Sequence, residues 1–260
     1  MQIGGIRLAL NIIVLIKQII DIDQIRTDPN TGEPVTQGIP FRVENLSKNA
    51  IEAAVQLKEK NGGKVTGIIF GTDKANAAIK EAYAMGVDDG IIITGYAGNN
   101  PSLTAHVLSE KIKSIPDYNV IILGNQSADS YTGVLPGLIA GKLSIPILGN
   151  AVSIEAEEGK IKIKRALEDK DQMISAPTPC VVSVTQEINQ PRLPPVLQIM
   201  AAGRKPIKTE QPSLVDIQAG KVIQWCWRLN EWILIFPLNL RITGRKSGNL
   251  PLRSSGRLLH

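Results

Sequence analysis

The stretch Ile122–Gly133, "ILGNQSADSYTG", combines groups that could bind a phosphorylated ligand. It begins as an apolar strand, breaks at Gly124 into small polar residues, and precedes a helix-like run, "VLPGLIAGKL". Small residues leave backbone N–H groups accessible, and a helix start favours an anion because its first N–H groups lack intrahelical partners. Hydroxyl groups add further donors, and that of Thr132 could also cap the helix. These hydroxyls belong to Ser127, Ser130 and Thr132.

Two longer polar side chains in the same stretch suit recognition better than acid–base catalysis. Gln126 and Asp129 could bond an amide, a ribose or an adenine edge, and Asp129 has no second acid or histidine near it in the sequence. The stretch is not a Walker A loop, since G-x-x-x-x-G-K-S/T is absent, nor a Rossmann G-x-G-x-x-G. An ordinary strand–helix loop with a capped helix remains an alternative explanation.

The residues around this stretch alternate between two periodicities. A continuous apolar run predicts a buried strand at residues 11–17, further strands are predicted at 64–71, 90–94 and 118–124, and helical spacing predicts helices at 46–61, 73–86, 102–114 and 133–143. Such alternation predicts βαβ units, hence an α/β fold with a doubly wound parallel sheet and helices on both faces. Ligands of such sheets bind at the carboxyl ends of the strands, where the winding reverses.

The pattern changes after residue 143. Two alternating strands around the turn at Glu158-Gly159 predict a short β-hairpin addition, and residues 180–188 predict one more strand. A Pro-rich loop then leads to a short helix near residues 196–202. We expect Cys180, Ile199 and Met200 to be buried.

Composition excludes several classes of function. Of the 260 residues 43% are apolar, and no apolar run reaches the roughly 18 residues of a membrane span. Residues 1–215 hold 22 basic and 22 acidic residues, so the net charge of +5 lies in residues 216–260. The body therefore has no electrostatic footprint for nucleic acid. Two cysteines without C-x-x-C suit a reducing, cytoplasmic location, and only two histidines make a histidine metal site unexpected.

Five segments follow one another in a distinctive order: "NIIVLIKQIID", "NAIEAAVQLKEKNGGKVTGIIFG", "AIKEAYAMGVDDGI", "ILGNQSADSYTG" and "VVSVTQEINQPRLPPVLQIMAAGRKPI". Together they resemble the beta subunit family of the electron transfer flavoproteins, over about residues 11–208. The A-M-G-V-D run, the G-x-Q-S-x-D loop and N-x-P-R…I-M-x-A…K-P-I are jointly specific. The resemblance implies a heterodimer with an alpha subunit that makes most of the contacts to a redox FAD.

The resemblance also implies an AMP beside the G-x-Q loop. Backbone contacts would come from Leu15, Ile16 and Phe70 at two strand ends. The loop itself would supply Gly124, Asn125, Gln126, Ser127, Ala128, Asp129, Ser130, Tyr131 and Thr132. In some family members a second FAD occupies this site and electron pairs are split between two acceptors, and the sequence leaves AMP and FAD open.

Two departures affect this assignment. The family commonly has Asn-Pro-x-Asp before its first helix, where this chain has "ENLS" at residues 44–47, and it often has a second acid where Tyr131 stands. The family also has a loop near "PRLPPVLQIM" that docks onto redox partners. By resemblance, Val196 and Leu197 would be the apolar contact and Arg192 part of its support, although a helix that packs on its own domain is the alternative.

Both ends depart from the family pattern. Residues 1–10 form an N-terminal extension, which a start codon assigned too early would explain. Residues 209–260 form a C-terminal arm or aberrant tail, because the part from residue 222 has no recognisable match and holds all three tryptophans. We expect the nucleotide-binding domain to span residues 11–208.

The leading functional hypothesis is an electron carrier subunit, not an enzyme. It would pass electrons from flavin dehydrogenases to a membrane quinone oxidoreductase without spanning the membrane itself, and it needs no acid–base pair. An ATP-splitting enzyme of the related fold is disfavoured, because "KQIIDID" stands where such enzymes have Ser-Gly-Gly-x-Asp-Ser. A non-redox, stress-type protein that binds adenine nucleotides is the third hypothesis.

Overall fold

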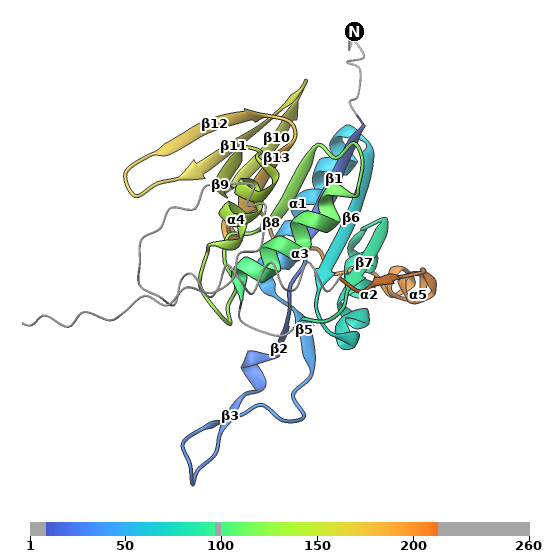
Figure 1. Ribbon diagram of the computed structural model, residues 1–260, viewed down its shortest axis with the longest axis vertical. Helices are drawn as coiled ribbons and strands as arrows, with labels where there is room; N and C mark the ends of the chain where they lie inside the picture. Colours follow the sequence, from blue (N-terminus) through green and yellow to red (C-terminus); the bar gives the residue numbers. More distant parts are fainter. Residues whose placement is uncertain (1–8, 97–99, 213–260) are drawn as a thin grey trace, which may run out of the picture.

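A seven-stranded parallel sheet forms the centre of the computed structural model, which describes residues 9–96 and 100–212 (Figure 1). The strand order is β14-β7-β6-β1-β8-β13-β9, and every neighbouring pair is parallel. The winding reverses beside β1, because β6 and β7 extend the sheet on one side of it and β8 and β13 on the other. The strands are β1 (Leu10–Leu15), β6 (Gly63–Phe70), β7 (Asp89–Ile93), β8 (Val120–Gly124), β9 (Ile147–Ala151), β13 (Cys180–Val184) and β14 (Lys208–Glu210).

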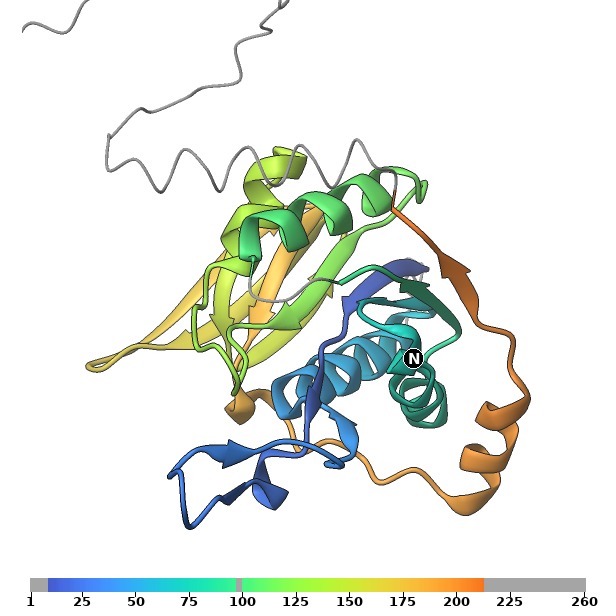
Figure 2. The same ribbon diagram turned by 60° about the horizontal axis from the view of Figure 1, so that its bottom comes forward.

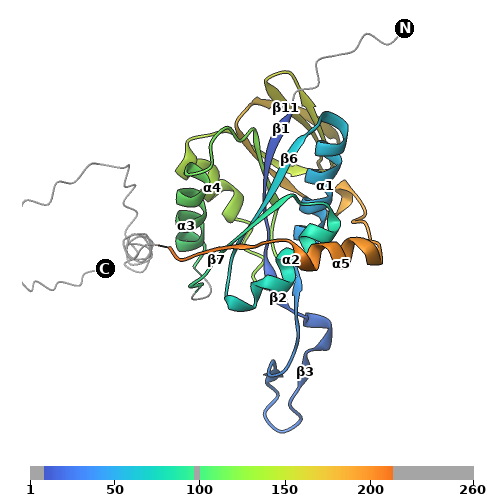
Figure 3. The same ribbon diagram turned by 90° about the vertical axis from the view of Figure 1, so that its right-hand side faces the viewer.

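Helices cover both faces of this sheet, as Figure 3 shows. Because side chains of a strand alternate between faces, Ile12 and Val14 of β1 belong to the core cluster with α1 and α2, whereas Ile13 and Leu15 belong to the cluster with α3 and α4. The doubly wound parallel fold predicted from the sequence is therefore confirmed. The helices are α1 (Asn45–Asn61), α2 (Asn76–Met85), α3 (Pro101–Lys113), α4 (Leu135–Leu143) and α5 (Val196–Arg204).

The predicted β-hairpin is part of a larger addition. β10 (Ser153–Glu157) and β11 (Lys160–Ala166) meet at the expected turn, but β12 (Asp171–Pro177) adds a third antiparallel strand. The prediction missed β12 because only Ile174 and Ala176 provide apolar side chains on its inner face, which is too weak an alternation to indicate a strand.

An arm at residues 18–43, for which no element was predicted, projects from the body in all three views (Figures 1 to 3). Its strands β2 (Gln18–Ile20) and β5 (Phe41–Val43) form one antiparallel pair, and β3 (Arg26–Thr27) and β4 (Pro34–Val35) form another. Strands of two or three residues are too short for a periodic signal, so the sequence pattern cannot reveal them.

The chain returns to the sheet after α5. Figure 2 shows this segment running around the outside of the molecule to β14, which pairs with β7. β14 thus includes residues 209 and 210, at the start of the expected C-terminal arm; residues 1–8 and 213–260 lie outside the described part. Cys180 is fully buried, as expected, and burial raises the pKa of its thiol to about 11. Among the described residues, no helix has the length and apolar character needed to cross a membrane.

Candidate functional site

A cavity of about 520 Å³ opens at the carboxyl ends of β1, β6 and β8. It therefore lies where the winding of the sheet reverses, which is the usual ligand position in this type of fold. Ala128 and Tyr131 do not contribute to its lining, and the side chain of Tyr131 points largely into solvent. Ten of the twelve predicted ligand residues do line it: Leu15, Ile16, Phe70, Gly124, Asn125, Gln126, Ser127, Asp129, Ser130 and Thr132.

The chain at Gly124 runs close against the first turn of α1. A Cβ atom at this position would lie 2.8 Å from the Cβ of Leu46 and 3.2 Å from the carbonyl oxygen of Gln126. This close approach is the reason for glycine at position 124. The backbone conformation is not the reason, because Gly124 does not have a positive φ. The loop after β8 thus starts close against α1, and its residues line the cavity.

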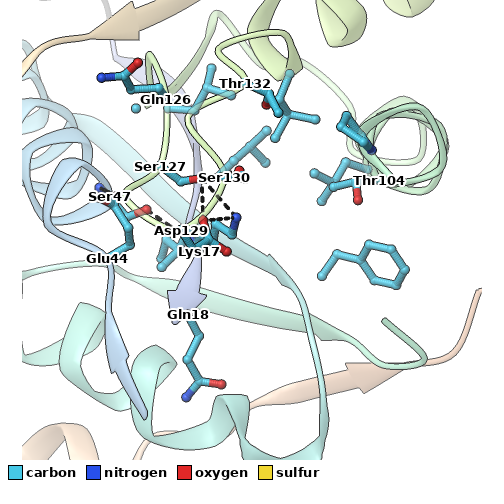
Figure 4. A pocket seen from close by; sticks show the side chains of 18 of the residues that line it. Lys17, Gln18, Glu44, Ser47, Thr104, Gln126, Ser127, Asp129, Ser130 and Thr132 are labelled. Carbon is cyan, nitrogen blue, oxygen red and sulfur yellow. Dashed lines mark hydrogen bonds and ion pairs between the residues drawn. The ribbon is translucent and has the colours of Figure 1, made fainter. Parts of the chain in front are cut away.

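Lys17, which was not predicted as a ligand residue, belongs to the polar wall of the cavity. Lys17 Nζ donates to Asp129 Oδ1 at 2.6 Å and to Ser127 Oγ at 3.0 Å (Figure 4). Ser127 Oγ in turn donates to Asp129 Oδ1 at 2.7 Å and shares a hydrogen bond of 2.9 Å with Ser130 Oγ. The sequence signal for Lys17 is a lysine at the end of a buried apolar run, two residues after β1, at the strand end where ligands bind.

The "ENLS" segment has a defined role despite its departure from the family pattern. The buried Glu44 caps α1, because its Oε2 accepts from the backbone N–H of Ser47 at 2.9 Å. The same two residues hold the backbone of Lys17. The N–H of Lys17 donates to Ser47 Oγ at 3.0 Å, and the carbonyl of Lys17 accepts from the N–H of Glu44 at 3.0 Å. The start of α1 therefore positions the end of β1.

Asp129 is ionised at neutral pH. Burial raises the pKa of this carboxyl, but hydrogen bonds from Lys17 and Ser127 outweigh burial, and the net effect is a pKa below the ordinary value of 3.8. A carboxylate held in this state is a poor proton acceptor near neutral pH, which agrees with a role in positioning.

The predicted cap of α4 is wrong. Thr132 does not cap this helix, because the helix begins at Leu135 and its N-cap residue is Val134, with no side-chain hydrogen bond. Gly133, with φ of +62°, turns the chain between Thr132 and the helix. The uncapped first turn borders the cavity through Leu135 and Pro136, and Thr132 also lines the cavity.

Another part of the cavity wall is aromatic and apolar. Phe70, at the end of β6, meets Tyr96 edge-on, with ring centroids 5.3 Å apart and an interplanar angle of 89°. Leu108 and Leu123 extend this lining. Tyr96 was not predicted as a site residue, because it follows β7 by three residues and belongs to no motif. The cavity thus offers an apolar face for a planar ring and a polar face for charged or hydroxylated groups.

The predicted docking segment lies away from the cavity. The Arg192 guanidinium forms a two-point pair with the buried Glu52, at 2.7 and 3.0 Å, and another with the exposed Glu59, at 2.7 and 3.0 Å. Val196 and Leu197 at the start of α5 are 72% and 80% exposed. The expected burial of Ile199 and Met200 is wrong, because Ala202 is the buried residue of α5 and both larger side chains lie in solvent.

Fold and site together define an α/β protein with a ligand cavity at the switch point of a parallel sheet. Residues 34–215 match the Electron transfer flavoprotein domain. "Electron transfer flavoprotein subunit beta" of Thermoanaerobacterium thermosaccharolyticum is 37% identical over 198 residues, which cover 75% of this chain and 76% of that protein. The protein of the same name from Clostridium acetobutylicum is 31% identical, over 82% of this chain and 83% of its own length.

A further relative is the "Caffeyl-CoA reductase-Etf complex subunit CarD" of Acetobacterium woodii, 29% identical over 76% of this chain and 77% of its own length. The chain belongs to the electron transfer flavoprotein family, among its beta subunits. The resemblance stated from the sequence is thereby confirmed.

Proposed function

We propose that this chain pairs with an electron transfer flavoprotein alpha subunit and holds AMP in the cavity at the switch point. The cavity carries this proposal, because it gathers ten residues assigned to the nucleotide from the sequence. Its features suit an adenylate: an aromatic wall for the base, hydroxyls for the ribose, and accessible N–H groups with one lysine for the phosphate. A ligand that binds only the folded subunit would also stabilise it.

The electron-carrying group in this proposal is an FAD held mostly by the alpha subunit, and it supplies one- or two-electron exchange when bound. The beta subunit completes the binding site and presents a surface to partners, in the cytoplasm. Electrons would come from flavin dehydrogenases and pass to a membrane quinone oxidoreductase. In this proposal the subunit is a carrier rather than an enzyme, because electron exchange at a bound flavin needs no acid–base pair.

A second FAD in the same cavity is the alternative. One observation favours it: a relative is named as part of a complex with a reductase. The cavity volume of about 520 Å³ lies within the general range of ligand sites. The adenylate half of FAD would use the same residues. The family membership favours both versions over a non-redox nucleotide-binding protein.

Co-expression with the alpha subunit from the same genome tests the proposal. We expect a yellow heterodimer whose visible spectrum shows the flavin bands. A colourless, stable homodimer that ignores the alpha subunit would contradict the proposed function.

The exposed start of α5 is the proposed docking surface for flavin dehydrogenases. Leu193 adds to it, with a side chain 93% exposed, and an apolar patch held on a rigid base is typical of a protein contact. We expect Leu197→Ala to lower the rate of electron transfer from the cognate dehydrogenase about tenfold, as for loss of one interface anchor. Stopped-flow reduction of the heterodimer measures this rate.

Met173→Ala is the matched control, because Met173 is also exposed but lies on β12. Both variants should keep the wild-type melting temperature. Equal electron-transfer rates for Leu197→Ala and wild type would remove α5 from the docking surface.

A further inference from the structure

Lys17 is the single cation among the described residues that line the cavity. The charged residues of the lining are Lys17, Glu44 and Asp129, so the wall carries one positive and two negative formal charges. A phosphate group brings between one and two further negative charges at pH 7. Without a cation close to the phosphate, this wall would repel a nucleotide. The position of the Lys17 ammonium therefore decides whether a phosphate can be accepted.

The Lys17 ammonium is held in place from both ends. The backbone of Lys17 is bonded to Ser47 and Glu44, and its side chain crosses from the end of β1 to the loop after β8, where it reaches Asp129 and Ser127. Figure 4 shows Lys17 and Asp129 joined, with Ser130 beside them. The ammonium thus has a fixed position before any ligand arrives, so little side-chain entropy is lost on binding.

The same ammonium retains capacity for a ligand. A lysine has three N–H donors, and the contacts to Asp129 and Ser127 account for two of them. About one third of the Lys17 side chain is exposed, at the cavity wall. A phosphate oxygen can therefore take the third donor without the Lys17–Asp129 pair being broken.

We infer that Lys17 is the cation that neutralises the phosphate of the bound adenine nucleotide, and that Asp129 and Ser127 hold its ammonium in position. This inference rests on the proposed function, because it assumes a nucleotide in the cavity. It deepens that proposal by assigning the phosphate to the β1–β8 side of the cavity. It also predicts that the site prefers phosphorylated over unphosphorylated adenosine.

The test compares AMP with adenosine on the full chain in complex with its alpha subunit, after the nucleotide has been depleted. Titration calorimetry on wild type should show tighter binding of AMP. In Lys17→Met we expect AMP affinity to fall at least about tenfold, as for loss of a charge-assisted hydrogen bond. Adenosine affinity should stay within about twofold, because adenosine has no phosphate to lose its partner. Lys17→Arg should bind AMP closer to wild type, since it keeps the charge.

Two controls separate this effect from a structural one. Lys170, on the turn after β11, is exposed and does not line the cavity. Lys170→Met should therefore change neither the AMP affinity nor the adenosine affinity. A higher salt concentration should weaken AMP binding to wild type, because salt screens the attraction between the Lys17 ammonium and the phosphate. The same increase should weaken AMP binding to Lys17→Met much less, because that variant lacks the ammonium. Lys17→Gln serves as a second neutral variant should Lys17→Met fail to fold.

Each outcome is decisive. Unchanged AMP affinity in both neutral variants would overturn the role of Lys17 and leave the proposed function standing. Equal losses for AMP and adenosine would also overturn it, because they would show a role in shaping the cavity alone. A wild-type complex that binds neither compound would overturn the inference together with the proposed nucleotide.

Discussion

Replacing Arg192 with methionine is expected to lower the free energy of unfolding by about 3 kcal/mol. The reason is the difference in burial between its two partners. Glu52 has only 4% of its side chain exposed, whereas Glu59 has 53% exposed. Removing the guanidinium leaves a buried carboxylate without its cation, and such a change costs much more than the loss of a surface pair. Urea unfolding of the purified heterodimer, followed by circular dichroism, measures the change.

Matched variants locate the effect. Glu59→Gln should cost less than about 1 kcal/mol, because that pair is largely solvated. Glu52→Gln should cost about 1.5–3 kcal/mol, as for the loss of a charged hydrogen-bond partner. Combining Arg192→Met with Glu52→Gln should recover part of the single-variant loss, since the buried charge is then absent. Equal costs for Glu52→Gln and Glu59→Gln would contradict this account.

The same cluster predicts a pH dependence with a definite sign. Burial raises the pKa of Glu52, but the hydrogen bonds and charge of Arg192 outweigh it, and the pKa of Glu59 is lowered chiefly by its hydrogen bond to Arg192. Both pKa values therefore lie below the ordinary 4.5, and the stabilisation is present above that pH. It is lost as pH falls through the folded-state values. Arg192→Met should flatten this acid limb.

The second large effect is expected at Gly124. Gly124→Val places a branched side chain where even a Cβ would lie 2.8 Å from Leu46, so the loop after β8 must move away from α1. We expect at least about a tenfold loss of AMP affinity, because the shifted loop carries the hydroxyls and Asp129 that face the cavity. Titration of the nucleotide-depleted heterodimer with AMP measures it.

Gly141→Ala is the matched glycine control. Gly141 lies on α4 with no atom within 4 Å of the added Cβ, so AMP affinity should not change. Gly124→Ala should fall between Gly124→Val and wild type, because it adds only the Cβ atom. Wild-type AMP affinity in a folded Gly124→Val heterodimer would show that the loop does not hold the nucleotide.

Strong periodicity made most of the fold predictable. β1, β6, β7 and β8 are rich in buried apolar residues, and α1 to α4 carry apolar residues at helical spacing, so their existence and order follow from the pattern. β12 and the arm at residues 18–43 were missed because short or weakly alternating strands depend on tertiary contacts. For Ile199 and Met200, apolar character alone wrongly indicated burial, since α5 packs through a narrow side that includes Ala202.

From its own residues the sequence indicated only the part of the site that one continuous loop supplies, whereas Leu15, Ile16 and Phe70 were predicted through the family resemblance. The run from Gly124 to Thr132 can be recognised by its small polar residues, but Lys17 is 112 positions from Asp129 and reaches it only because β1 and β8 are neighbours. Sequence order does not state which strands pair. Tyr96 is missed for the same reason. It follows β7, which lies two strands from β1, and its place in the cavity wall beside Phe70 depends on that strand order.

The most direct test of the nucleotide site is the content of the purified wild-type heterodimer. Acid extraction, followed by chromatography with mass detection, gives the adenine compounds per complex. We predict one adenine compound per complex in addition to the single FAD of the alpha subunit, and this compound is either AMP or a second FAD. A yellow heterodimer that releases one FAD and no other adenine compound would contradict it.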